Sequence, residues 1–389
     1  MTLRTVVALV VCALALLALP WIIGNEFYVN MATQVLIYAL FALSINMMLG
    51  YGGMVSLGHA GYLGIAGYAC ILAVTAGYDH LTAAIFAVAL STAAAAFFGL
   101  LSLRAPGLGF IMITLALGQI VWGIAYRAND LTGGDNGIRY PARPMPFGFD
   151  LRDASSFYYF TLAVFVVALF CIWRFSRSPF GASLMGTRDQ PRRMRMLGYN
   201  VWLIQWLTFV MAGFWASIAG VLYVYYNLFL SPHAISLQQS AEILLMAILG
   251  GASTLTGPIV GAAIITLVKN VISTYVERWN TLLGLIFVVV IMFMPYGLVP
   301  GCAQLWRRVR NLGKTPKGAS GASVVRAHSA SEDARERAGD TRPEPGSSAR
   351  GALASEASGQ RGEAKMMRAP DTRPEPGSSA RGAASEPAQ

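Results

Sequence analysis

Residues 50–67 read GYGGMVSLGHAGYLGIAG and directly follow the uncharged apolar run 31–49. The stretch opens a second apolar run, 54–76, and glycine recurs at every third position from 58 to 67. On a helix, this spacing makes a slowly spiralling groove without side chains, which a neighbouring helix can approach closely. The stretch therefore predicts glycine-interrupted helices packed in an apolar setting.

The composition extends this apolar setting to most of the chain. Of the 389 residues, 55% are Ala, Val, Ile, Leu, Met, Phe, Trp, Tyr or Cys, and only 12% are charged. A soluble domain has about 45–50% apolar residues with glycine included, and about 25% charged residues. So little charge cannot cover the surface of a soluble protein of this size. An ordinary cytosolic enzyme and a nucleic-acid-binding protein are therefore excluded.

The charges divide the chain into two parts. Residues 1–306 carry 14 Lys and Arg and nine Asp and Glu, whereas residues 307–389 carry 15 and ten. We predict a transmembrane domain at 1–306 and a cytoplasmic, low-complexity tail at 307–389 that is too polar to bury a core and is disordered. The tail repeats DTRPEPGSSARGA at 340–352 and 371–383. An internal duplication is the favoured account, and a binding tail is the alternative.

A helix that crosses the hydrocarbon core needs about 20 apolar residues. The predicted fold is all-α, a polytopic transmembrane helix bundle of about 8–10 spans, because two of ten candidate runs are short and adjoin. The ten runs are 5–24, 31–49, 54–76, 82–103, 108–126, 157–173, 203–227, 241–256, 257–275 and 281–299. The first run can also be read as a signal peptide, but the bulky residues Trp21 and Ile22 stand where cleavage needs small ones.

Arginine predicts the orientation of these spans, since cytoplasmic loops are enriched in Lys and Arg. The link 174–200 carries six arginines against one acidic residue, whereas the loop 127–156 balances four arginines with four aspartates. With ten spans, 174–200 and both termini lie in the cytoplasm and 127–156 lies outside. The four cysteines and four histidines are scattered without a CxxC or HExxH spacing, so we predict neither a metal site nor a disulfide framework.

A second glycine stretch, 250–261, reads GGASTLTGPIVG and shares the pattern Gly-Gly-x-x-Ser/Thr-Leu with residues 52–57. In transporters, interrupted spans in the two halves indicate the substrate path, because broken helices expose backbone groups that only a water-lined cavity tolerates. Close helix packing alone is the alternative. The candidate pathway residues are Gly52, Gly53, Ser56, His59, Gly61, Gln119, Gly250, Gly251 and Thr254. Pro258 is expected to break or kink a helix.

Few polar groups lie inside the runs. Glu242 and Lys269 are each within one or two turns of a span end, so snorkelling to the interface explains both. His59 is read equally well as a packed, hydrogen-bonded residue and as a cavity-lining one. Asn46 and Gln119 either bond across helices or line a path.

Residues 181–197 place Met and Leu on one side and Arg on the other, which predicts a short amphipathic helical pair that stops at Leu197-Gly198. Such a segment can lie on lipid or dock in a groove of a partner, or it is a plain orientation loop. The chain has no GxxxxGK[ST] motif, so we predict that it does not hydrolyse ATP itself. It also lacks a series of membrane carboxylates, which disfavours a proton-driven transporter.

Taken in order, GYGGMVSLGHAGYLGIAGY, LTGGDNGI, SPFG…LGYN and ILGGASTLTGPIVGA, with PYGLVPG at 295–301, resemble the LivM-type permease of branched-chain amino-acid ABC importers. The resemblance covers residues 30–300 or so. It implies an inner-membrane subunit that pairs with a LivH-like second permease, two cytoplasmic ATP-binding subunits and a periplasmic substrate-binding protein. No cofactor is implied for this chain, since ATP is bound by the partner subunits.

The resemblance also implies a coupling loop that sits in the ATPase cleft. Its candidate residues are Arg188, Asp189, Arg192, Arg193, Arg195, Leu197 and Gly198. Family members usually carry a form like IRENE there, whereas this chain reads TRDQPRR at 187–193 and lacks the second acidic residue. Any salt bridge assigned to that acid is in doubt, and Pro191 fits the first turn of a helix.

The outer loop 127–156 is expected to receive the solute from the binding protein, with Gly133, Gly134 and Asn136 as candidate mouth residues. The implied solutes are leucine, isoleucine and valine or a related small solute. A permease for urea or short amides, and a passive channel for a small polar solute, remain open. A membrane enzyme is disfavoured because no paired acids, nucleophile–base pair or metal cluster is evident.

Overall fold

The computed structural model describes residues 25–141 and 153–272, with isolated residues between 17 and 21 and between 281 and 301. All of them belong to one compact unit, Met1–Thr315. The expected run 5–24 and the expected run 281–299 lie largely outside the described residues, and the predicted tail lies wholly outside them.

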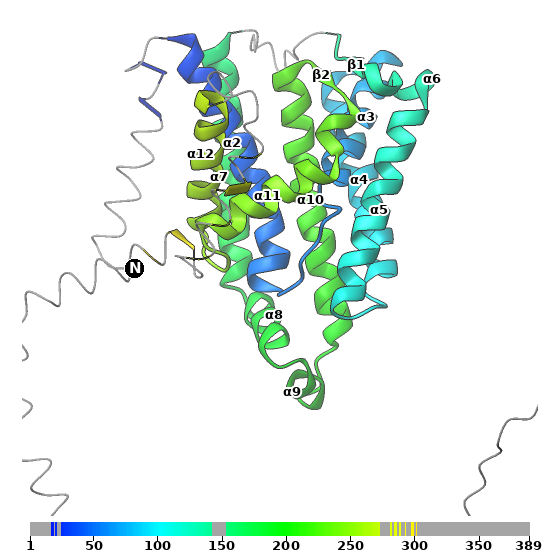
Figure 1. Cartoon of the computed structure of the whole chain (residues 1–389), viewed down its shortest axis with the longest axis vertical. Helices are drawn as coiled ribbons and strands as arrows, with labels where there is room; N and C mark the ends of the chain where they lie inside the picture. The colour runs from blue at the N-terminus through cyan, green and yellow to red at the C-terminus, as the bar shows by residue number, and fades with distance from the viewer. Residues whose placement is uncertain are drawn as a thin grey trace, which may run out of the picture. The chain divides into compact units, whose positions relative to one another are not determined.

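The described chain is a bundle of helices, which confirms the all-α, polytopic fold (Figure 1). Five helices are long and apolar enough to cross a membrane. They are α2 (Glu26–Asn46, continued by the π-helical turn η1, Met47–Tyr51), α4 (His80–Ser102), α5 (Leu108–Arg127), α7 (Ala154–Ser176) and α10 (Val201–Asn227). Three shorter apolar helices accompany them, α3 (Ala60–Thr75), α11 (Leu237–Gly250) and α12 (Gly257–Ile272).

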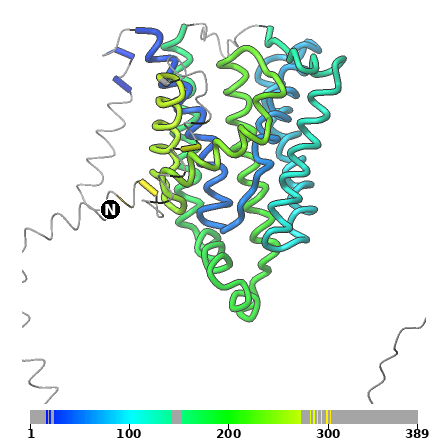
Figure 2. Tube along the Cα trace, in the orientation of Figure 1, coloured from blue at the N-terminus to red at the C-terminus, as the bar shows by residue number. Residues whose placement is uncertain are grey.

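α2 forms the centre of the bundle and packs against α7, α10, α11 and α12 (Figures 1 and 2). From Leu36 to Asn46 every side chain is buried, as expected for a helix that is apolar all round. Only 22% of the most hydrophobic window of α4 and of α5 is buried, and α5 lies at the edge of the bundle (Figure 1). The bundle therefore has a closed core around α2 and an open flank along α5.

Small residues let α4 approach its neighbours. Ala83, Ala87, Ser91, Ala95 and Gly99 follow at four-residue spacing and are all buried. A Cβ added at Gly213 of α10 would lie 2.3 Å from the Cβ of Ala95. Membrane helices associate through such small-xxx-small contacts. Lipid tails are as apolar as the side chains, so close packing takes the place of the hydrophobic effect.

The two ends of the bundle differ (Figure 1). At one end, strand β1 (Ile138–Arg139) pairs antiparallel with β2 (Phe229–Leu230), close to α6 (Asn129–Thr132) and η2 (Gly134–Asn136). The short helices α8 (Pro179–Asp189) and α9 (Pro191–Met196) project from the other. We call these the ribbon end and the α8 end. The predicted helical pair at 181–197 is thus confirmed.

Two sequence-based boundaries were wrong. The run 54–76 becomes helical only at Ala60, because the left-handed backbone of Gly53 (φ +68°) stops the preceding helix and 54–57 stay non-helical. The run 241–256 forms a helix that begins earlier, at Leu237, where Ser236 caps it, and ends at Gly250. Pro258 was expected to break or kink a helix, and a break is found: α11 ends at Gly250, and Pro258 lies in the first turn of α12, where its missing N–H would have no helical partner.

Candidate functional site

Both glycine motifs end a helix in the same way. η1 ends at Tyr51 and α11 ends at Gly250. The second glycine of each motif then takes a positive φ, +68° at Gly53 and +117° at Gly251. Glycine adopts such angles without a steric penalty. The shared pattern is therefore a repeated helix stop.

The structure brings the two breaks into contact. The Asn46 side chain donates from Nδ2 to the Thr254 carbonyl at 3.0 Å and accepts from the Ser253 N–H at 3.2 Å. The Ser253 hydroxyl donates to the Gly50 carbonyl at 2.7 Å. A Cβ at Gly50 would lie 2.4 Å from the Ser253 nitrogen, so a side chain there would prevent this approach. Asn46 thus bonds across helices.

A cavity of about 810 Å³ opens beside the first break at the α8 end. Its walls are residues 52–55, the turn before α5 with the first turn of α5, the α8–α9 segment and the first turn of α10. Arg104, Arg188 and Arg195 contribute to the lining. We call this the inner cavity. The inner cavity is therefore lined both by arginines and by the first glycine motif.

Beyond the inner cavity, the chain between the break and α3 closes on α5. A Cβ at Gly58 would lie 2.1 Å from the Thr114 carbonyl oxygen, and a Cβ at Gly118 would lie 2.7 Å from the Gly58 Cα. Two backbones therefore meet here without side chains between them. Ile111 of the inner cavity shares one face of α5 with Thr114 and Gly118, because these residues follow at three- and four-residue spacing.

A second hollow, the outer pocket, lies beside α5 on the ribbon side of this contact and has a volume of about 420 Å³. Gln119, Trp122 and Tyr126 line it from α5, and the rings of Trp122 and Tyr126 stack with centroids 5.2 Å apart. Asp135 of η2 and His233 of η4 (Pro232–Ile235) line it as well, with the start of α11. The outer pocket therefore offers a carboxylate, an imidazole, an amide and an aromatic surface.

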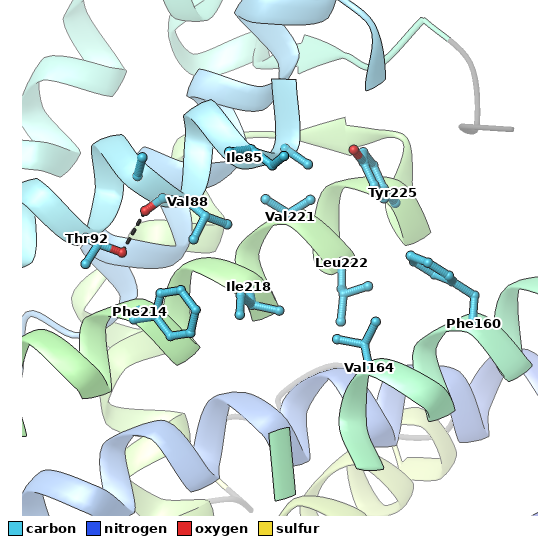
Figure 3. A pocket seen from close by; sticks show the side chains of 12 residues that line it. Ile85, Val88, Thr92, Phe160, Val164, Phe214, Ile218, Val221, Leu222 and Tyr225 are labelled. Atoms are coloured by element: carbon cyan, nitrogen blue, oxygen red, sulfur yellow. Dashed lines mark hydrogen bonds between the residues drawn. The ribbon is translucent and has the colours of Figure 1, made fainter. Parts of the chain in front are cut away.

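A third hollow, of about 630 Å³, lies between α4, α7 and α10 and is almost wholly apolar (Figure 3). Its two polar side chains are already engaged. The Thr92 hydroxyl donates to the Val88 carbonyl at 2.7 Å, and the Tyr225 hydroxyl donates to the His80 carbonyl at 3.0 Å. A polar solute would find no partner there, so this groove is not part of the candidate path.

His59 is fully buried beside the Gly58 contact. Its Nε2 is 2.8 Å from the Ser44 hydroxyl, and its ring stacks on Phe41 with centroids 5.5 Å apart. Within the described chain, His59 Nδ1 and the Ser56 hydroxyl have no hydrogen-bond partner. His59 and Ser56 line none of the three hollows. The geometry places both in the packed region between the inner cavity and the outer pocket.

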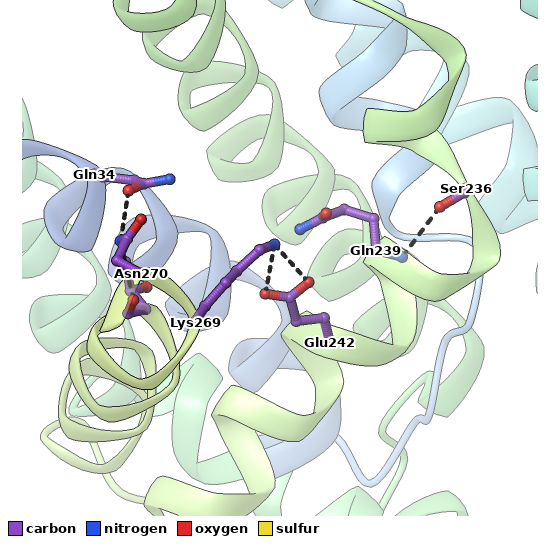
Figure 4. Close-up of polar contacts among 7 residues, drawn as sticks. Gln34, Ser236, Gln239, Glu242, Lys269 and Asn270 are labelled. Carbon is purple, nitrogen blue, oxygen red and sulfur yellow. Dashed lines mark hydrogen bonds and ion pairs between the residues drawn. The ribbon is translucent and has the colours of Figure 1, made fainter. Parts of the chain in front are cut away.

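Glu242 and Lys269 form an ion pair, and the snorkelling explanation was wrong (Figure 4). The Lys269 Nζ lies 3.1 Å from both carboxylate oxygens of Glu242, whose side chain is only 3% exposed. Asn270, next to Lys269, donates to the Gln34 side chain at 3.0 Å. Each charge therefore turns inward because its partner is there, and the pair joins α11 to α12.

The sequence family described as "Branched-chain amino acid transport system / permease component" matches residues 27–294, which include both breaks, α5 and the α8–α9 segment. The chain belongs to this permease family. Among the described residues, no group of three or more His, Cys, Asp or Glu is placed to hold a metal ion.

Two kinds of transport permease, LivM and LsrC, are similar to this chain in sequence. It is 27% identical over 313 residues to the high-affinity branched-chain amino acid transport system permease protein LivM of Salmonella typhimurium, covering 74% of each chain. The LivM protein of Escherichia coli gives the same identity and coverage. The autoinducer 2 import system permease protein LsrC of an Enterobacter species is 26% identical, covering 67% of this chain and 77% of LsrC. No solved structure matches the chain.

Within this permease, the predicted coupling residues separate into two groups. The Arg188 side chain is 40% exposed, but its guanidinium reaches the two breaks and donates to the Gly50 carbonyl and to the Ser253 hydroxyl. The others are exposed at the tip, namely Asp189, Arg192, Arg193, Arg195, Leu197 and Gly198. Gly198 has φ +86° after the last turn of α9, as the predicted helix stop requires.

The predicted mouth residues lie in the turn around η2. Gly133 and Gly134 have φ of +69° and +58°, and Gly134 is buried while Asn136 is exposed. Neither glycine lines the outer pocket; the residue of this turn that does is Asp135. A Cβ added at Gly61 would lie 3.7 Å from the Val121 Cβ of α5, which is ordinary van der Waals distance. Whether these residues handle solute stays a prediction.

Sequence reasoning found Gln119 but missed Trp122, Tyr126, Asp135 and His233. The spacing of Gln119, Trp122 and Tyr126, by three and then four residues, was a usable signal because it places them on one helix face. Asp135 and His233 carried no such signal, since they come from two loops that only the β1–β2 ribbon brings together.

Proposed function

We propose that the chain is the membrane-spanning subunit of an ATP-driven importer that moves branched-chain amino acids into the cytoplasm. The observation that carries this proposal is the pair of hollows along α5, one toward each end of the bundle, separated by the backbone contact of Gly58 with Thr114 and Gly118. A permease needs such an arrangement, because it must open one hollow at a time and close the path between them.

The chemistry of the outer pocket supports an amino acid as the solute. The Asp135 carboxylate suits an ammonium group, and the stacked Trp122 and Tyr126 rings offer an apolar surface for an aliphatic side chain. The LivM relatives are named for branched-chain amino acids and the LsrC relatives for autoinducer 2. Urea and short amides carry no ammonium group, so they would not require Asp135.

The proposed partners are a LivH-like second permease, two cytoplasmic ATP-binding subunits and a periplasmic substrate-binding protein. The exposed flank of α5 supports a second permease, and the α9 tip, where Met196 and Leu197 are 89% and 65% exposed, supports docking to an ATPase. ATP is bound by the partners, and this chain needs no cofactor. We place it in the bacterial inner membrane with both termini in the cytoplasm, because the arginine-rich α8–α9 segment marks the cytoplasmic end.

The test is uptake into proteoliposomes that contain the permease with its proposed partners. Labelled leucine should enter only with ATP, and cysteines placed at 190–196 should cross-link to the ATP-binding subunit. A passive channel would continue to work without ATP and would give no adduct. Uptake of urea or acetamide in place of leucine would replace the solute while keeping the transport class.

A matched pair of variants tests the solute through the outer pocket. Asp135→Asn should raise the leucine concentration needed for half-maximal uptake, whereas Asp130→Asn, on the neighbouring helix α6 and outside the pocket lining, should not. If both variants behave like the parent, the ammonium of the solute is not recognised at Asp135.

A further inference from the structure

Arg188 connects the α8–α9 segment to both glycine breaks. It lies in the last turn of α8, and its Nη1 donates to the Gly50 carbonyl and to the Ser253 hydroxyl, the latter at 2.7 Å. Gly50 belongs to the end of α2, and Ser253 belongs to the turn between α11 and α12. A single side chain from the loop therefore holds one group from each break.

The surroundings are shaped for this side chain. A Cβ at Gly53 would lie 2.8 Å from the Arg188 Cγ, so only glycine lets the arginine stem pass. Guanidinium has a planar set of donors that can serve two acceptors at once, whereas an ammonium acts as a point charge. Asp189 pairs with a different nitrogen of Arg188: its carboxylate lies 3.7 Å from Nε, with the two side chains 40% and 73% exposed, which leaves Nη1 to Gly50 and Ser253.

Ser253 is held in an unfavourable conformation at the same place. Its φ is +71°, a left-handed angle that non-glycine residues adopt rarely. Three hydrogen bonds hold Ser253 in this conformation. Its N–H donates to the Asn46 side chain, its hydroxyl donates to the Gly50 carbonyl, and the same hydroxyl accepts from Arg188. Strain of this kind persists only where the surroundings impose it, and it is found at switch regions. The turn can therefore relax when Arg188 withdraws.

We infer that Arg188 is the positioning residue through which movement of the α8–α9 segment reaches the two breaks. The inference rests on the proposed ATP-driven function. When the ATP-binding partners move α8, the guanidinium pulls the Gly50 and Ser253 ends together or releases them. Because Gly52 and Gly53 line the inner cavity beside Arg188, this motion opens or closes that cavity. The alternative is an ordinary structural tie that stabilises the fold without transmitting motion.

The test measures leucine uptake and ATP hydrolysis in the same proteoliposomes for Arg188→Ala, Arg188→Lys and Ser253→Ala. A transmitting residue predicts a fall in leucine moved per ATP of about tenfold for Arg188→Ala, since hydrogen bonds to charged groups are the strong ones. Arg188→Lys should recover only part of the ratio. Ser253→Ala should also lower it, and the double variant should be no worse than Arg188→Ala alone. Arg174→Ala, an exposed arginine at the same end of the bundle, is the matched control and should keep the parental ratio.

A structural tie would lower the amount of assembled complex and leave the ratio unchanged, which would overturn the inference. If Arg188→Ala does not assemble, normal ratios in Arg188→Lys and Ser253→Ala overturn it equally. If the parent complex itself moves leucine without ATP, the proposed function fails, and that result is read from the parent before any variant is compared.

Discussion

Lys269 on α12 places its Nζ 3.1 Å from both carboxylate oxygens of Glu242 on α11, so the two helices that flank the second glycine break are joined by a partly buried ion pair. The Lys269 ammonium also lies 5.9 Å from the centre of the Tyr38 ring on α2. The pair therefore fixes the break and its two helices against the centre of the bundle.

Removing one charge of this pair should destabilise the protein strongly. Glu242→Gln removes the carboxylate that the partly buried Lys269 ammonium contacts; loss of one charge of a fully buried pair costs about 3–5 kcal/mol, so we expect a cost of at most this size. We expect a lower melting temperature in detergent and less inserted protein. The exchange Glu242→Lys with Lys269→Glu should recover most of the loss. Equal melting temperatures for Glu242→Gln and the parent would contradict a stabilising pair.

The close approach of the Gly58 and Gly118 backbones should leave no room for an alanine side chain at Gly118. Gly118→Ala places a Cβ 2.7 Å from the Gly58 Cα, and overpacking of this kind costs about 1–3 kcal/mol. We expect a lower melting temperature and reduced uptake. Gly123→Ala on the same helix is the control, because nothing lies within 4 Å of its added Cβ. Identical behaviour of the two alanine variants would show that the Gly58 backbone does not approach α5 at Gly118.

Two residues of the turn around η2 should respond differently to substitution, because Gly134 supports the turn and Asn136 is a predicted mouth residue. Gly134→Ala forces an alanine into φ +58° with its Cβ 1.9 Å from Asn129 Oδ1, so it should disrupt the turn and lower both the amount of folded protein and uptake. Asn136 is exposed, so the Asn136→Ala protein should insert into the membrane normally. If Asn136 contacts the binding protein, uptake falls while insertion does not; parental uptake would remove Asn136 from the mouth.

Tyr140 should make the ribbon end sensitive to alkali. Burial, first of all, raises the pKa of its phenol well above the ordinary value, and the hydroxyl lies 2.6 Å from His80 Nδ1. The unfolded chain loses this proton near pH 10, whereas the folded protein retains it. The stabilisation is therefore complete below about pH 10 and declines as the pH rises above it. Melting curves between pH 8 and 11 should show a smaller alkaline loss for Tyr140→Phe, and an unchanged loss would exclude Tyr140 as its source.

Local sequence determined most of the fold. The uncharged apolar runs predicted α2, α4, α5, α7 and α10, because hydropathy over a window of helical length decides membrane crossing. The paired glycine motifs predicted two interruptions, and the structure shows a helix stop at each. The Met, Leu and Arg pattern predicted α8 and α9. The exact starts were missed where a non-helical segment, such as 54–57, is as apolar as the helix that follows it.

Tertiary structure alone decided which residues meet. Asn46 and Thr254 are 208 positions apart, and Lys269 and Glu242 are 27 positions apart, so no local pattern could pair them. In the sequence, Arg188 does not differ from the other arginines of its loop; only the packing of α8 against the two breaks brings its guanidinium to Gly50 and Ser253. A glycine permits a neighbouring backbone to come close, but the packing of whole helices determined which backbone does so. The physical reason is that a contact depends on the relative position of two elements, whereas a helix stop depends only on its own residues.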